Sequence, residues 1–174
     1  MRRVHESPAA ENRPRFPLFV DLSGRRCLVA GAGEVGLRRA RCLARFGAHV
    51  VLVDPRLSDG EDSADGRGCP LVPEGVEAIF REYEPGDEAG CALVVAATDD
   101  REANRLIGSR CRDAEIPVSV ADVPGECTFF FPAICMGDDV VAGVVSRSGD
   151  HRAAASAAAR VRTAIAHAEG EGSA

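Results

Sequence analysis

Short apolar runs and longer amphipathic stretches alternate along the middle of the chain. Continuous apolar runs are typical of parallel strands that are covered on both faces. Such runs lie at residues 26–30, 49–53, 92–97 and 116–121. Residues 34–46 carry apolar side chains at helical spacing, and residues 101–114 follow two aspartates that can cap a helix. This order of strands and helices predicts an α/β fold with a doubly wound parallel sheet.

Weaker patterns flank this region. Residues 76–83 alternate between apolar and polar positions and predict a half-buried strand. The apolar segment 16–22 is expected to pair at a sheet edge, where its proline is tolerated. After Asp122, residues 127–134 and 140–146 predict an antiparallel pair of strands around a turn, before an Ala-rich helix at 152–168.

These patterns predict three parts. They are a disordered lead at residues 1–15, a Rossmann-like nucleotide-binding domain at 16–122, and a small β and helical segment at 123–174. Residues 57–75 are acidic and rich in glycine and serine, without periodicity, so we expect a loose surface loop there.

The first apolar run leads into a GxGxxG turn that opens a helix. Gly31 permits the tight turn, Gly33 lets the backbone approach a pyrophosphate, and Gly36 lets the helix pack closely on the strand. The second run ends on Asp54, about 20 residues further on, where a carboxylate can accept ribose hydroxyls. A 2′-phosphate would meet that negative charge, so the motif predicts NAD as the cofactor rather than NADP. The alternative is a glycine-rich turn that binds nothing.

Because ligands of such sheets bind beyond the carboxyl ends of the strands, we expect four polar residues beside the cofactor cleft. They are Thr98, Asp99, Ser119 and Asp122.

Composition narrows the function classes. A formal net charge of −6 argues against a broad nucleic-acid footprint. All basic residues other than histidine are arginines, so Schiff-base chemistry on lysine is excluded. The seven cysteines form no CxxC pair and no zinc spacing, which predicts no metal site and a reducing, cytoplasmic setting. No run approaches the roughly 20 apolar residues of a membrane span.

Several segments in a particular order carry a resemblance to a known family. They are the lead-in Phe16-Pro17-Leu18-Phe19-Val20-Asp21-Leu22, the turn Gly31-Ala32-Gly33-Glu34-Val35-Gly36, Ala96-Ala97-Thr98-Asp99-Asp100 with Asn104, and Asp122 followed by Phe129 to Ala133. Over residues 16–146 the chain resembles the precorrin-2 dehydrogenase and sirohydrochlorin ferrochelatase family, the N-terminal NAD-binding part of siroheme synthase. The resemblance implies NAD⁺-dependent oxidation of the tetrapyrrole precorrin-2 to sirohydrochlorin, with ferrous iron insertion in some members.

The resemblance also implies residue roles. Gly31, Gly33, Glu34, Val35 and Gly36 match the pyrophosphate turn. Pro55 and Arg56 match the segment lining the adenosine side. Asp122 matches the catalytic aspartate of the family, where a carboxylate can accept a proton from the macrocycle or stabilise cationic charge. Its alternative role is to cap a turn before Pro124.

The chain departs from the family pattern in three places. Ser119 stands where the family usually has asparagine, and His151 aligns roughly with a family serine, so both are candidate substrate contacts, and His151 could alternatively contact a metal. A solvated surface role is the alternative for His151. The family continues into a larger helical region that forms a homodimer, whereas this chain carries one Ala-rich helix there. Arginines are the candidates to bind the substrate carboxylates, with a solvated helix face as the alternative; these are Arg147, Arg152, Arg160 and Arg162.

Two other functions remain open from the sequence. A nucleotide-sensing Rossmann module of the kind that regulates potassium transport shares the glycine turn and the acidic strand end. A degenerate homologue that only binds a tetrapyrrole is the third possibility.

Overall fold

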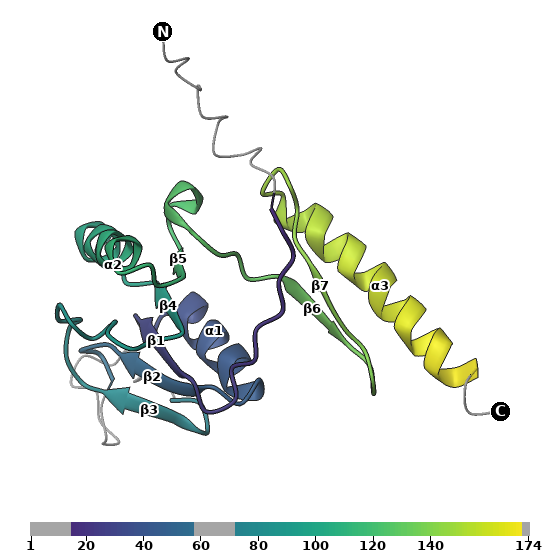
Figure 1. Cartoon of the computed structure of the whole chain (residues 1–174), viewed down its shortest axis with the longest axis horizontal. Coiled ribbons are helices and arrows are strands. Elements are labelled where there is room, and N and C mark those ends of the chain that lie inside the picture. The colour runs from purple at the N-terminus through teal and green to yellow at the C-terminus, as the bar shows by residue number, and fades with distance from the viewer. Residues whose placement is uncertain (1–14, 58–71, 172–174) are drawn as a thin grey trace, which may run out of the picture. The chain divides into compact units, whose positions relative to one another are not determined.

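The structure is a computed structural model that describes residues 15–57 and 72–171 (Figure 1). Most of the expected lead and of the expected loop at 57–75 lies outside the described residues. Contacts within the chain form two compact units. One is Val20–Phe129, and the other combines the chain before residue 20 with Phe130–Ala174. The domain bounds expected from the sequence stay a prediction.

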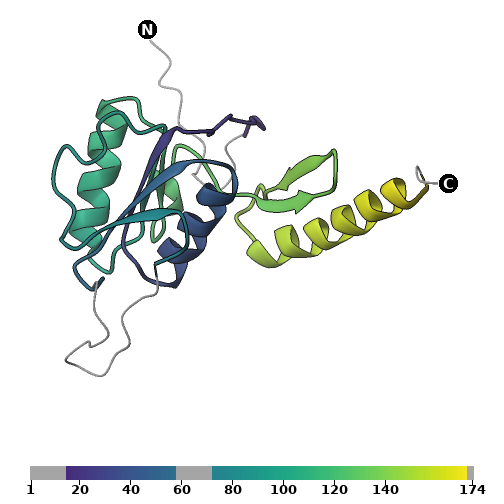
Figure 2. The same ribbon diagram turned by 90° about the horizontal axis from the view of Figure 1, so that it is seen from below.

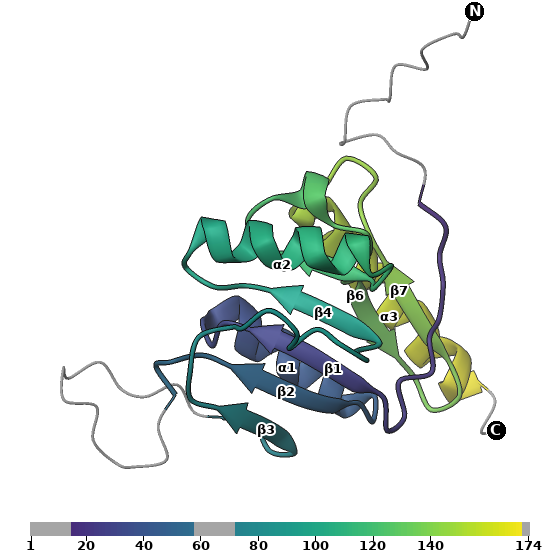
Figure 3. The same cartoon turned by 60° about the vertical axis from the view of Figure 1, so that its left-hand side comes forward.

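The larger unit is built on a five-stranded parallel sheet in the order β3-β2-β1-β4-β5. Its strands are β1 (Arg26–Ala30), β2 (His49–Val53), β3 (Val76–Ile79), β4 (Leu93–Ala96) and β5 (Val118–Val120). From β1 the chain steps outward through α1 (Glu34–Arg45) to β2, and on the other side from β4 through α2 (Arg101–Asp113) to β5. Right-handed crossovers in opposite directions place the two helices on opposite faces of the sheet, as Figures 2 and 3 show. The expected fold class is confirmed.

The core lies between the sheet and its helices. The central strands consist almost wholly of Val, Leu, Ala and Cys, and their side chains are nearly inaccessible. From α2, Ile107 and Cys111 complete the cluster on one face. Each fully buried Val or Ile contributes about 1.5–3 kcal/mol to the free energy of folding relative to an exposed one. Burial of the apolar runs therefore stabilises this unit without a need for disulfides.

The ends of the two helices differ. Asp100 caps α2, because its Oδ1 accepts hydrogen bonds from the backbone N–H of Glu102 and Ala103. α1 begins after Gly33 with no side-chain cap, and it ends before Gly47, whose φ of +74° suits glycine. The first turn of α1 therefore keeps backbone N–H groups for another partner.

The smaller unit contains a hairpin and a helix. β6 (Ala133–Met136) pairs antiparallel with β7 (Val141–Val144), and both contact α3 (His151–Glu171). Asp150 caps α3 by accepting from the backbone N–H of Arg152 and Ala153. Arg15 lies over the ring of Phe130, 3.9 Å from its centroid.

Two sequence expectations are wrong. Residues 16–22 form no strand, and Phe16, Leu18 and Phe19 are largely exposed. The strand expected at 127–134 begins only at Ala133. The segment before it instead runs beside β5, where the N–H of Thr128 donates to Val118 O over 2.8 Å. Pro132 has no N–H for a ladder, which delays the hairpin.

Candidate functional site

The glycine-rich turn follows β1 at the carboxyl edge of the sheet. Gly31 has φ +102°, and a Cβ there would lie 2.2 Å from Ala97 O. A Cβ on Gly36 would lie 1.8 Å from Gly31 O, so this glycine allows α1 to pack on the turn. A Cβ on Gly33 would meet nothing within 4 Å. Two of the three glycines therefore serve the packing of the turn, and the third leaves open space beside the uncapped start of α1.

The two residues that follow Gly33 lie at this open end of the turn. Glu34 is exposed and forms a 4.0 Å ion pair with Arg38, and Val35 is half-buried. Backbone N–H groups at a helix N-terminus together with the helix dipole favour an anionic group. The turn has the local shape and polarity that a pyrophosphate requires.

Asp54 ties the end of β2 to this turn. Its side chain is 3% exposed, and its Oδ2 accepts the N–H of Ala32 over 2.6 Å. Burial opposes the charged form, but hydrogen bonds from Arg56 and Ala32 outweigh it and lower the pKa of Asp54. The carboxylate thus fixes the glycine turn from 22 residues away. The ribose contact expected of Asp54 stays a prediction.

Arg56 joins two strand ends. Its Nε and Nη2 donate to Asp54 over 3.0 and 2.7 Å, and its Nη1 donates to Asp99 over 2.6 Å. The hydrogen bonds that Arg56 donates to Asp54 raise the pKa of Arg56. Pro55 is exposed beside it. The ends of β2 and β4 are therefore linked by one guanidinium between two carboxylates, with a net charge of −1.

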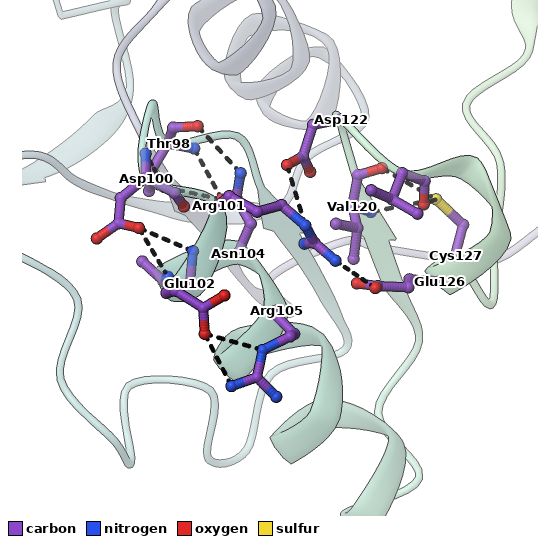
Figure 4. Close-up of polar contacts among 12 residues, drawn as sticks. Thr98, Asp100, Arg101, Glu102, Asn104, Arg105, Val120, Asp122, Glu126 and Cys127 are labelled. Atoms are coloured by element: carbon purple, nitrogen blue, oxygen red, sulfur yellow. Dashed lines mark hydrogen bonds and ion pairs between the residues drawn. The ribbon is translucent and has the colours of Figure 1, made fainter.

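Asn104 orders the loop after β4, a role that the sequence analysis did not assign. It is 1% exposed, and its Oδ1 accepts from both the N–H and the hydroxyl of Thr98 over 3.0 and 2.8 Å. Its Nδ2 donates to Thr98 O over 3.0 Å. Figure 4 shows these contacts beside the Asp100 cap. An asparagine six residues after the threonine that follows β4 is the sequence signal that could have identified it.

Asp122 follows β5 and is partly exposed. Its Oδ2 lies 3.8 Å from Nε of Arg101, whose Nη2 also contacts Oε1 of Glu126 (Figure 4). Glu126 ends the short 3₁₀ helix η2 (Pro124–Glu126). The candidate catalytic carboxylate thus faces a cation that another carboxylate holds, and the sequence analysis named neither Arg101 nor Glu126.

Ser119 lies inside the larger unit. It is 3% exposed, and its hydroxyl accepts a hydrogen bond from Nη1 of Arg39 over 3.2 Å. Burial lowers the pKa of Arg39. The thiol of Cys127 accepts the N–H of Val120 over 3.2 Å close by. Ser119 therefore fastens β5 to α1, and its expected substrate contact stays a prediction.

The remaining candidates belong to the smaller unit. Arg147, His151 and Arg152 are exposed there, with His151 at the first position of α3. Arg162 donates to the backbone oxygen of Ile134 over 3.2 Å, so it holds α3 on β6. Exposed arginines remain available to carboxylates, and their substrate roles stay predictions.

The comparison with protein families agrees with this geometry. A family model described as "Putative NAD(P)-binding" matches residues 18–133, more than half of the chain. The chain belongs to this NAD(P)-binding family. The matched residues include the glycine turn, Asp54, Asp122 and the segment up to the start of β6.

Curated relatives point to one pathway. The chain is 42% identical over 151 residues to the "Probable multifunctional siroheme biosynthesis protein HemA" of Ruminiclostridium josui, covering 85% of this chain and 28% of the relative. It is 41% identical over 135 residues to the siroheme synthase of Pseudomonas paraeruginosa, covering 78% of this chain and 28% of the relative. The chain thus spans little more than a quarter of the length of these proteins. The resemblance to the NAD-binding part of siroheme synthase is confirmed.

A solved structure agrees in fold. "SirC, precorrin-2 dehydrogenase" superposes with a TM-score of 0.63 at 17% identity, covering 88% of this chain and 70% of that one. At this identity the likeness concerns the fold.

Neither a cluster of metal ligands nor a membrane-spanning helix is present among the described residues. Residues 15–57 and 72–171 hold no group of three His, Cys, Asp or Glu side chains placed to bind a metal ion. In the same part of the chain, none of the helices combines the length and apolar character needed to cross a membrane.

Proposed function

We propose that this chain oxidises precorrin-2 to sirohydrochlorin with NAD⁺ as a step of siroheme biosynthesis. The observation that carries the proposal is the pairing of two features of the larger unit. An open, uncapped glycine turn follows β1, and a partly exposed carboxylate, Asp122, follows β5. Parallel strands place both features at the carboxyl edge of one sheet.

The glycine turn fits the pyrophosphate of a dinucleotide. The space at Gly33 and the free N–H groups of α1 suit its charge, and Asp54 keeps the turn in place through Ala32. Glu34 and Val35 supply first-turn backbone to this cradle. Two further residues follow β4 beside this turn: Thr98, whose position is fixed by hydrogen bonds to Asn104, and Asp99, which pairs with Arg56.

We further propose that NAD is preferred over NADP. Asp54, Asp99 and Arg56 together carry a net charge of −1 at the end of β2, where the adenosine ribose is expected. A 2′-phosphate there is repelled. Replacing Asp99 by Asn removes one charge and releases one end of Arg56, so this variant is expected to bind NADP more tightly relative to NAD. Titration calorimetry with both dinucleotides measures the ratio, and an unchanged ratio contradicts this assignment.

In the reaction, bound NAD⁺ supplies the hydride acceptor. Asp122 then takes the proton that the macrocycle loses, or stabilises positive charge developing on it. Precorrin-2 carries eight carboxylates, and the exposed Arg147 and Arg152 are the groups that we assign to them, with His151 and Ser119 as further contacts.

The proposal also includes a cellular compartment and an oligomeric state. The free cysteines Cys27 and Cys111 are buried, and burial raises their pKa values to about 11 and about 12, so these thiols are unreactive at neutral pH. Such thiols suit the reducing cytoplasm, where we place the reaction. A homodimer is part of the proposal by analogy with the family.

The decisive assay is anaerobic turnover of precorrin-2, followed by its visible spectrum and by NADH formation. We expect NAD⁺-dependent conversion by the native chain and a loss of at least about 100-fold in Asp122→Asn, the size typical of a missing general base. Asp113→Asn, an exposed aspartate at the end of α2, is the matched control and should remain active. A folded protein that binds NAD⁺ without turnover contradicts the enzyme and favours the nucleotide-sensing module or the tetrapyrrole binder.

A further inference from the structure

Arg101 occupies an unusual place in the larger unit. It is the first residue of α2, directly after the Asp100 cap, and its guanidinium lies between two carboxylates from the chain after β5. Glu126 takes the close contact with Nη2, while Asp122 lies 3.8 Å from Nε. Figure 4 shows the three side chains in one row, with Arg101 in the middle.

The hydrogen bonding of these three side chains is incomplete. Among the described residues, the buried side-chain atoms without a partner are Nη1 of Arg101 and Oε2 of Glu126. Buried polar atoms in proteins are nearly always hydrogen-bonded, so the two unpartnered atoms of this ion pair need an explanation, and a role in catalysis is one. The guanidinium is anchored at one edge and retains donors.

The contact to Asp122 is an ion pair beyond hydrogen-bond range, since N–H···O bonds join atoms about 2.7–3.2 Å apart. Catalytic hydrogen bonds are often long without substrate and tighten in the complex. A shortening of this separation by about 0.6 Å would bring Nε within hydrogen-bond range of Asp122.

We propose that Arg101 is the positioning residue for Asp122, orienting its carboxylate toward the substrate. The inference rests on the proposed oxidation of precorrin-2 and deepens it. Glu126 fixes Arg101, so that a single cation from α2 serves a carboxylate of the segment after β5. Arg101 itself does not touch the reacting atoms in this assignment.

The kinetic test compares two arginines of the same helix. Arg101→Gln is expected to lower kcat for precorrin-2 about 10- to 100-fold, the cost of a misplaced catalytic group, with the KM for NAD⁺ within about twofold of native because the glycine turn is untouched. Arg101→Lys keeps the charge without the fork and should recover part of kcat. Arg105→Gln is the control, because Arg105 makes an exposed ion pair with Glu102 and should leave kcat unchanged.

A second readout does not need turnover. In protein labelled with ¹³C at aspartate Cγ, the Asp122 signal, assigned from Asp122→Asn, should move in Arg101→Gln, move less in Arg101→Lys and stay in place in Arg105→Gln.

The outcomes separate the two proposals. A native kcat in Arg101→Gln, or a fall in kcat that Arg105→Gln matches, overturns the positioning role. The positioning role is also overturned if the ¹³C signal of Asp122 does not move in Arg101→Gln. Arg101→Lys is measured beside it, so that the result can be interpreted even if Arg101→Gln is destabilised. If the native chain does not oxidise precorrin-2 at all, the proposed function fails, and the carbon signal alone decides whether Arg101 orients Asp122.

Discussion

The two units of this chain bury their apolar residues very differently. The sheet unit Val20–Phe129 encloses Leu28, Val94, Ile107 and many similar side chains completely. Among the described residues of the smaller unit, only Cys135 and Ala158 are buried apolar residues, whereas Met136, Val140 and Val141 are exposed. A sheet covered by helices on both faces supplies its own core, but one helix on a two-stranded hairpin is too small to enclose many side chains. Stability therefore resides in the larger unit.

Separating the units tests this comparison most directly. We expect a chain of residues 20–129 to unfold in one cooperative transition, and a peptide of residues 130–174 to lack one, because so short a segment buries too little surface. Circular dichroism during urea titration measures both. A cooperative transition in the peptide contradicts the comparison.

Gly36→Ala is expected to have the largest effect of the single substitutions. Its Cβ would lie 1.8 Å from Gly31 O, a backbone atom that cannot move without displacing the turn. We expect a loss of about 4 kcal/mol in the free energy of unfolding, at the upper end of overpacking effects.

Gly33→Ala is the matched control for stability, because its Cβ meets open space. It should change the free energy of unfolding by less than about 0.5 kcal/mol while weakening NAD⁺ binding about tenfold or more, since the backbone must approach the pyrophosphate. Equal stability losses in both variants would contradict the division of roles among the glycines.

Ile107→Ala tests the core itself. Ile107 is fully buried between α2 and the sheet, and truncation leaves a cavity there, which should cost about 3 kcal/mol. Urea unfolding at constant m-value measures the loss. The exposed Leu106 beside it is the control, and Leu106→Ala should cost far less.

Acid acts on the larger unit through Asp54 and Asp87. Hydrogen bonds from Arg81 lower the pKa of Asp87, and those from Arg56 and Ala32 outweigh burial and lower that of Asp54. A depressed folded pKa means that the unfolded chain binds more protons, so this stability is complete above about pH 4 and is lost as the pH falls below it.

Asp54→Asn sharpens that prediction. It should lower the free energy of unfolding by about 2 kcal/mol at pH 7, because buried donors lose a charged acceptor. It should also make unfolding less dependent on pH between about 5 and 3, the range in which the aspartates of the unfolded chain take up protons. Denaturant titrations across this range measure both. A pH dependence as steep as in the native chain would show that Asp54 is not one of the responsible groups.

Val141→Ala should have the smallest effect. Val141 lies exposed on β7, opposite Met136, and its truncation is expected to cost about 0.5 kcal/mol or less. A loss comparable with that of Ile107→Ala would mean that the hairpin is buried in solution, and sedimentation velocity would then show whether a second copy covers it.

The elements of the sheet were predictable because their signals are local. The ranges expected for 26–30 and 49–53 coincide with β1 and β2, and the helices differ from expectation by a residue or a few at their ends. The strand expected at residues 16–22 was a wrong prediction, because apolar composition alone does not supply a strand to pair with. The site was predictable only where a motif has its own spacing, as in the glycine turn.

By itself, the sequence determined the order of strands and helices, the glycine turn and the acidic end of β2, since these depend on periodicity and on the conformational freedom of single residues. Only the tertiary structure decided that Asp54 binds Ala32, that Arg56 joins two strand ends, and that Arg101 lies between Asp122 and Glu126. These contacts join residues that are distant in the chain. These residues meet because the parallel strands end at the same edge of the sheet, and a local sequence pattern does not contain that information.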